Sequence, residues 1–198
     1  MLEVENFLDK DLFAIFEDLA EKVNEFEFYW PTKLNFIVRK ESDGTVNSFV
    51  KTRWGSSGDS PAETFDYLIE LEESLQDKIF DALKELQKNY FHAYEDYGKK
   101  LTDNNFKVDT FQTDLQFLET DTEVEPHIHH TGVSSVIYVR PRESKGTIFN
   151  DKVVDWKPNK AIMFTQETHS FMNTSSSVKR VNINIFINQD DSSHKLLS

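Results

Sequence analysis

Four of the six histidines in this chain lie in two patches toward its C-terminal end. The first patch spans residues 126–130, with the sequence PHIHH, and the second is His169. In a strand, His127 and His129 point to the same face, because strand side chains alternate. Two neutral imidazoles from one strand and a third from a later strand suit a divalent transition metal that keeps positions open for a substrate. We therefore predict a metal site made of His127, His129 and His169.

An arginine follows the second patch. Arg180 lies eleven residues after His169 and opens a run with alternating character. The apolar face of this run holds Val181, Ile183, Ile185 and Ile187, and its other face holds Arg180, Asn182, Asn184 and Phe186. A polar face of this kind is typical of a cavity lining, where a guanidinium can hold a carboxylate through two hydrogen bonds. A solvent-facing surface is the alternative interpretation.

The composition indicates a globular, acidic protein. We predict a single domain, residues 1–198, because this length fits one domain of ordinary size. The 17 Phe side chains can supply a core, which excludes wholesale disorder. The 35 acidic and 22 basic residues give a formal charge of −13, which disfavours binding to the phosphates of nucleic acids.

The sequence also lacks the marks of several other protein classes. No apolar run approaches the roughly 20 residues of a membrane-spanning helix, and no basic cluster suits an anionic membrane. The first residues do not resemble a signal peptide, and the absence of Cys rules out disulfides and thiolate metal sites. We expect a cytoplasmic protein without nucleic-acid or membrane partners.

The first half of the chain, residues 1–110, is predicted to be mainly helical support with a short hairpin. Asp9 caps a helix with apolar residues at helical spacing up to Val23. Short strands at 34–38 and 46–51 follow. A capping box at 60–63 starts a second helical pattern that reaches Gly98, with a break near Glu73 as an alternative. The apolar stripe of this helix suits burial against a sheet, and a homodimer is the competing explanation.

From residue 111 the pattern changes to short strands. The predicted strands are 111–119, 125–130, 133–140, 147–149, 161–165, 170–173 and 180–187, with turn residues between them. Seven strands at this spacing indicate an antiparallel sandwich or roll. Residues 111–188 therefore form the predicted core that carries the site, and 189–198 form a polar tail.

At these motifs the chain resembles the Fe(II)/2-oxoglutarate-dependent oxygenases, in their prolyl-hydroxylase-like branch. Residues 5–12 (ENFLDKDL) are similar to the way those chains open, and 115–118, 126–129 and 134–139 resemble their strand–ligand–strand core. The hairpin at 147–151, His169 and the strand from Arg180 resemble the C-terminal part of the family pattern. The resemblance implies an α+β protein with a double-stranded β-helix (jelly roll) and helices packed outside.

The same resemblance implies roles for single residues. His127 matches the first iron ligand and His169 the last, while Arg180 matches the partner of the distal 2-oxoglutarate carboxylate. Asn182 supports that carboxylate, and Tyr138 lines the cosubstrate pocket and offers it a hydrogen bond. The implied activity is a dioxygenase that uses Fe(II), 2-oxoglutarate and O2 to hydroxylate a C–H bond of a small molecule or peptide.

One residue departs from the family pattern. The middle ligand is usually Asp or Glu, two residues after the first histidine, and here that position holds His129. A set of three histidines carries one negative charge less than the usual set. Glu125 and Asp151 are the candidates for a replacement carboxylate.

Three other functions stay open. The first is a cupin-like protein with three histidines, or a dioxygenase that does not use 2-oxoglutarate, although no Glu follows the HxH motif before Glu143. The second is a zinc hydrolase or lyase, for which the sequence shows no obvious general base. The third is a jelly-roll binding module whose histidines hold no metal.

Overall fold

The fold is taken from a computed structural model. It describes residues 1–24, 33–41, 44–53, 73–118, 120, 123–129, 131–150, 152–175 and 177–189. The predicted capping box at 60–63, His130, Asp151 and the tail from 190 lie outside the described residues.

The larger of two sheets has seven antiparallel strands in the order β1-β9-β6-β11-β4-β2-β3. Their bounds are β1 Leu2–Val4, β9 Ala161–Phe164, β6 Val133–Arg140, β11 Arg180–Gln189, β4 Val108–Leu118, β2 Lys33–Glu41 and β3 Val46–Arg53. The central strands β6, β11 and β4 come from the second half of the chain. The β2–β3 hairpin extends this sheet by pairing with β4.

The smaller sheet has four strands in the order β5-β10-β7-β8. Their bounds are β5 Glu123–His127, β10 His169–Met172, β7 Ile148–Phe149 and β8 Lys152–Val153. An apolar cluster joins the two sheets, and it consists of Val136, Tyr138, Phe149, Val154, Ile162 and Phe164, with Trp156 packed against it. Two facing antiparallel sheets confirm the predicted jelly roll.

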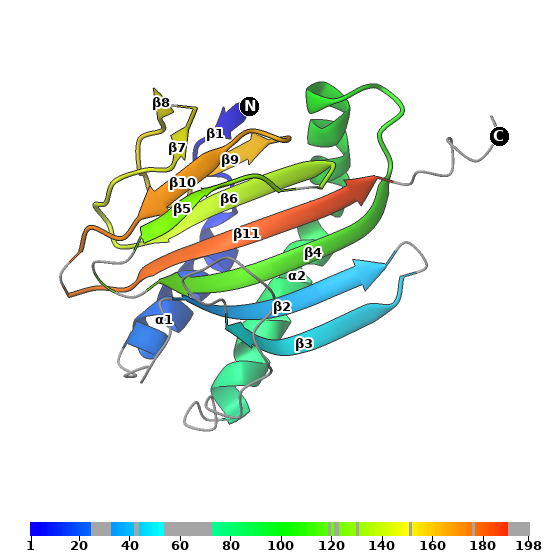
Figure 1. The fold of residues 1–198 in the computed structure, drawn as a ribbon. Coiled ribbons are helices and arrows are strands. Elements are labelled where there is room, and N and C mark those ends of the chain that lie inside the picture. The colour runs from blue at the N-terminus through cyan, green and yellow to red at the C-terminus, as the bar shows by residue number, and fades with distance from the viewer. Residues whose placement is uncertain are drawn as a thin grey trace.

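Two helices cover the other face of the large sheet (Figure 1). Helix α1 spans Lys10–Asn24 and begins as predicted, because the Asp9 carboxylate accepts hydrogen bonds from the backbone N–H groups of Asp11 and Leu12. Helix α2 spans Glu73–Leu101. No helix in the described part of the chain is long and apolar enough to cross a membrane.

Strand β11 separates the core under the helices from the space between the sheets. Val181, Ile183, Ile185 and Ile187 are buried in the main core, together with residues of both helices. The alternate residues from Arg180 to Phe186 therefore face the smaller sheet. The period-two pattern of this strand predicted both faces correctly.

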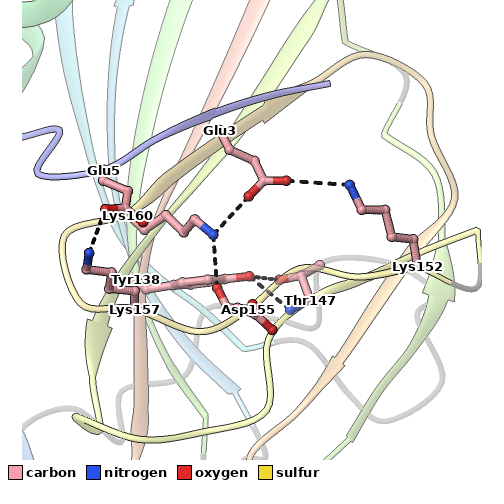
Figure 2. A network of polar contacts seen from close by, with 8 residues as sticks. All are labelled: Glu3, Glu5, Tyr138, Thr147, Lys152, Asp155, Lys157 and Lys160. Atoms are coloured by element: carbon pink, nitrogen blue, oxygen red, sulfur yellow. Dashed lines mark hydrogen bonds and ion pairs between the residues drawn. The ribbon is translucent and has the colours of Figure 1, made fainter.

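The N-terminal strand β1 is held at the edge of the large sheet by charged pairs (Figure 2). Glu3 pairs with Lys160 at 2.8 Å and with Lys152 at 3.7 Å, and Glu5 pairs with Lys157 at 2.6 Å. The hydrogen bond from Lys160 holds the pKa of Glu3 below its usual value. The sequence analysis did not predict β1, because three residues are too short to show a period.

Gly98 plays a different part from the predicted helix stop. The helix continues to Leu101, and a Cβ at position 98 would collide with the ring of buried Phe106. This glycine lets the segment after α2 pack closely against the helix.

Candidate active site

The three predicted metal ligands meet between the two sheets. His127 ends β5 and His169 begins β10, and the two residues are direct partners in the antiparallel pair. The ring centroids of His127 and His169 lie 4.3 Å apart, and His129 lies 4.9 and 4.6 Å from them. One ligand atom from each histidine lies within 4.8 Å of the others.

Hydrogen bonds orient each ring. The Nδ1 atoms of His127 and His169 lie 2.8 and 3.1 Å from the backbone carbonyls of Glu125 and Glu167. Since a carbonyl only accepts, each neutral ring carries its hydrogen on Nδ1 and keeps the lone pair on Nε2. Such second contacts are typical of metal-ligating histidines.

His129 is oriented by a hydroxyl pair. Its Nδ1 lies 3.1 Å from Ser134 Oγ, which in turn lies 2.8 Å from Thr131 Oγ1. The Nε2 atoms of His127 and His129 are 3.1 Å apart. Two nitrogens bound at right angles to one ion are about 3 Å apart, given metal–nitrogen bonds of about 2.1 Å. The three neutral nitrogen donors therefore fit a divalent transition metal.

Aromatic rings surround the three histidines. Phe149 and Phe164 pack on His169, with ring centroids at 5.5 and 4.7 Å, and Phe186 packs on His129 at 4.8 Å. His169 is almost fully buried, and the other two ligands are half-buried. The cluster is therefore packed against apolar rings at His129 and His169 and is partly exposed to solvent at His127 and His129.

The described residues include no carboxylate in this cluster. Glu125 is exposed and contributes its backbone carbonyl to His127. The other candidate carboxylate, Asp151, lies outside the described residues.

Arg180 is fully buried on the same face of the large sheet. Its Nη1 donates to the carbonyls of Lys145 and Met172, at 2.8 and 2.9 Å. Its Nε and Nη2 have no hydrogen-bond partner among the described residues. One edge of the guanidinium is therefore fixed by the backbone, and the other edge presents donors in the parallel geometry that suits a carboxylate.

Three aromatic rings enclose this guanidinium. Its central carbon lies 4.6 Å from the Trp156 ring, 4.7 Å from Phe171 and 5.6 Å from Tyr138. Burial lowers the pKa of Arg180 to about 10, so the side chain is still a cation at neutral pH. A buried cation without a carboxylate partner is costly, and an anionic ligand would offset that cost.

The remaining predicted residues lie beside Arg180. Asn182 is fully buried, and its Oδ1 and Nδ2 have no hydrogen-bond partner among the described residues. Tyr138 is the cross-strand neighbour of Asn182. Its hydroxyl donates to Thr147 Oγ1 at 2.8 Å and accepts from Thr147 N–H at 2.9 Å, so Tyr138 acts as a wall of the pocket, braced by Thr147.

Several residues around Arg180 could not be predicted from the sequence. Trp156 stacks on Tyr138 with ring centroids 4.2 Å apart, and its indole N–H donates to the Pro141 carbonyl at 2.7 Å. Phe171 and the Lys145 carbonyl come from other segments. No spacing rule links these positions to Arg180, because the contacts form only when the sheets face each other.

Comparisons with known proteins give a low-level likeness to solved structures. No family model matches the chain, and no curated protein matches it. A prolyl-4-hydroxylase from Pseudomonas putida is 11% identical over 96% of this chain and 92% of that chain, with a TM-score of 0.47. A cupin superfamily protein from Desulfitobacterium hafniense is 13% identical over 39% of this chain and 67% of that chain, with a TM-score of 0.33.

A salicylate 1,2-dioxygenase from Pseudoaminobacter salicylatoxidans is 9% identical over 39% of this chain and 21% of that chain, with a TM-score of 0.32. Similarity at this level carries no information about activity. The site geometry must therefore support any functional conclusion by itself.

Proposed function

We propose that the protein is an Fe(II)- and 2-oxoglutarate-dependent dioxygenase. It would hydroxylate a C–H bond of its substrate while 2-oxoglutarate is converted to succinate and CO2. The observation that carries the proposal is the pairing of a three-histidine cluster with a buried arginine whose Nε and Nη2 are unpaired among the described residues. When bound, the iron and the keto acid supply the activation of dioxygen.

The protein's own residues would bind and orient. His127, His129 and His169 would hold the ion through their Nε2 atoms. Arg180 would hold the distal carboxylate of the keto acid, with help from the Asn182 amide. The rings of Trp156 and Phe171 would shield that ion pair from water, which strengthens the attraction between the charges.

A second function is favoured by one observation. Within the described residues the ligand group contains three histidines and no carboxylate, which also suits a cupin-like metal protein, or a dioxygenase that does not use 2-oxoglutarate. In that case Arg180 would hold a carboxylate of the substrate itself.

Anaerobic titration of the Fe(II)-loaded protein with 2-oxoglutarate distinguishes the two. We expect the visible charge-transfer band of a chelated keto acid in the wild type. In Arg180→Met the band should require at least about tenfold more 2-oxoglutarate, since a charge-assisted pair contributes about 1.5–3 kcal/mol. Iron content should stay unchanged in this variant.

His127→Ala and His169→Ala are the matched variants of the metal ligands, and both should lose iron. Iron binding without a band in the wild type would favour the cupin-like alternative. Iron loss in Arg180→Met equal to that in the histidine variants would contradict the separate roles of the two groups.

A further inference from the structure

The face of the large sheet that is turned toward the smaller sheet has an apolar part, which we call the apolar wall, and a polar part, which we call the polar wall. The apolar wall is the cluster around Val136 and Phe164 on β6 and β9. The polar wall is formed by β4 and β11, and we define it as Gln112, Asp114, Gln116, Asn182 and Asn184. Antiparallel pairing sets Asn182 opposite Gln116 and Asn184 opposite Asp114, so these side chains share the face that carries Arg180.

The polar wall connects the two parts of the site. Along β11, Arg180 is followed on this face by Asn182, Asn184 and Phe186, and Phe186 packs on His129. Asn182 and Asn184 are both buried, with 0% and 7% of their surfaces exposed. The wall therefore runs from the anion pocket to the histidine cluster.

Two acceptor oxygens of the polar wall have no hydrogen-bond donor among the described residues. Gln116 is 1% exposed, and its Oε1 has no hydrogen-bond partner among the described residues. The same holds for Asn182 Oδ1 on the neighbouring strand. Further along, Asp114 Oδ1 accepts from Gln112 Nε2 at 3.0 Å, so that part of the wall is internally bonded. Buried polar atoms are nearly always hydrogen-bonded, and an exception calls for a ligand or a water.

2-Oxoglutarate cannot satisfy these acceptors. As a dianion it has only acceptor oxygens, so it pairs with the donors of Arg180 and with Asn182 Nδ2. The carbonyl oxygens of Gln116 and Asn182 can accept only from an O–H or N–H group, which a water or a bound polar molecule would supply.

We propose that Gln116 and Asn182 form a recognition site for the primary substrate, which presents an O–H or N–H donor to their carbonyl oxygens. The substrate class is then a neutral polar compound, with hydroxyl or amide groups beside the C–H bond that reacts. A hydrocarbon chain or lipid would leave the wall unsatisfied. This inference rests on the proposed function, because only an enzyme has a primary substrate. Binding of a donor at Gln116 and Asn182 can nevertheless be measured without turnover.

Matched pairs of small probes test the donor requirement. N-methylacetamide and N,N-dimethylacetamide differ by one N–H, and ethylene glycol and 1,2-dimethoxyethane differ by two O–H groups. Binding would be measured by ligand-observed NMR on the full chain, both metal-free and loaded with Zn(II). In at least one pair, we expect the probe with the donor to bind at least about threefold more tightly than the probe without it. A preference in the acetamide pair would indicate that the site recognises an amide, and a preference in the glycol pair would indicate a hydroxyl.

Gln116→Met and Gln116→Glu are the matched variants. Met has a similar length without an acceptor carbonyl, so the preference should weaken and only the part that depends on Asn182 Oδ1 should remain. Glu keeps an acceptor at position 116, so the preference should persist. Equal binding within both pairs, or a preference that is unchanged in Gln116→Met, would overturn the proposal.

Thermal unfolding separates recognition from a structural role. If Oε1 is unpaired, Gln116→Met should unfold at the wild-type temperature or higher, because an unsatisfied polar atom has been removed. A melting temperature several degrees lower would show that the amide stabilises the fold, and would count against the site.

The proposed function and the recognition site can fail separately. If the Fe(II)-loaded wild type shows no 2-oxoglutarate band but still prefers the donor-bearing probes, the proposed function is rejected and the recognition site is still supported.

Discussion

At the scale of single residues, Arg180 is the least expected feature of the molecule. A fully buried guanidinium usually faces a carboxylate, and here the described residues supply two backbone carbonyls and three aromatic rings instead. The carbonyls fix the orientation of the side chain but do not neutralise its charge. This arrangement stabilises a bound anion more than it stabilises the empty protein.

The charge of Arg180 predicts how anion binding depends on pH. Burial lowers its pKa to about 10, whereas burial raises the pKa of neighbouring Tyr138. The affinity for 2-oxoglutarate should be constant from pH 7 to 9. It should then fall toward tenfold per pH unit above about pH 10, because the guanidinium loses its proton in the free protein.

Isothermal titration between pH 7 and pH 11 measures this, with circular dichroism to confirm that the fold persists. Arg180→Lys is a useful comparison, because a buried ammonium loses its proton at a lower pH and the fall should start earlier. A flat affinity through pH 11 would show that the buried guanidinium keeps its proton over this range, contrary to the expected fall.

At the scale of elements, strand pairing places the histidine cluster and a short loop supports Arg180. The β5–β10 pair sets His127 against His169. The loop before β7 holds Arg180 through the Lys145 carbonyl and Tyr138 through Thr147. Strand β10 contributes to both halves, because it begins with His169 and its Met172 carbonyl accepts from Arg180. The contacts of Lys145 and Thr147 belong to the Arg180 half, so a change in their loop should perturb that half first.

A substitution at Gly146 tests whether this loop supports anion binding at Arg180. A Cβ at this position would collide with the backbone carbonyl of Val154, so Gly146→Ala must shift the loop that carries Lys145 and Thr147. We expect a loss of about 2 kcal/mol, which lowers the melting temperature by about 4–8 °C for a chain of this size. The affinity for 2-oxoglutarate should fall at least tenfold, while iron content stays unchanged.

Gly98→Ala is the control, since its Cβ would collide with Phe106 under the helices instead. This variant should lose comparable stability and keep the wild-type affinity for 2-oxoglutarate. If both variants weaken 2-oxoglutarate binding equally, general destabilisation explains the effect and the loop has no specific role.

At the scale of the whole molecule, one jelly roll brings distant segments to one site. The site joins residues from 114 to 186, and β1 at the N-terminus closes the same sheet next to β9. We predict that the chain unfolds as a single cooperative domain. Metal binding should then stabilise the entire fold.

Differential scanning calorimetry tests both expectations. Fe(II) or Zn(II) at 100 times its dissociation constant should raise the melting temperature by about 5–10 °C. The reason is that binding at this concentration adds about 2.7 kcal/mol to the free energy of unfolding. A chelator should reverse the shift, and His169→Ala should abolish it. Two separate transitions, with only one moved by metal, would show that the N-terminal part unfolds independently.

Sequence alone determined the periodic elements and the kinds of chemistry available. The strand at 133–140 and the start of β11 were predicted to the residue. The alternation of side chains along β11 placed Arg180 and Asn182 on the face opposite the core under the helices. The HxH motif and His169 were enough to predict that these three histidines form one cluster, and the structure brings them together. Their role as metal ligands stays a prediction. Short or non-periodic features, such as β1, β8 and the packing role of Gly98, left no signal in the sequence.

Only the tertiary structure decided which residues meet. Trp156, Phe171 and the Lys145 carbonyl reach Arg180 from three separate segments, and Gln116 lies beside Asn182 because β4 pairs with β11 in one register. Only the positions of all described neighbours show which polar atoms lack a hydrogen-bond partner. These atoms include Nε and Nη2 of Arg180 and the carbonyl oxygen of Gln116. The physical reason is that hydrogen-bond satisfaction and burial depend on long-range contacts, whereas propensity and periodicity are local.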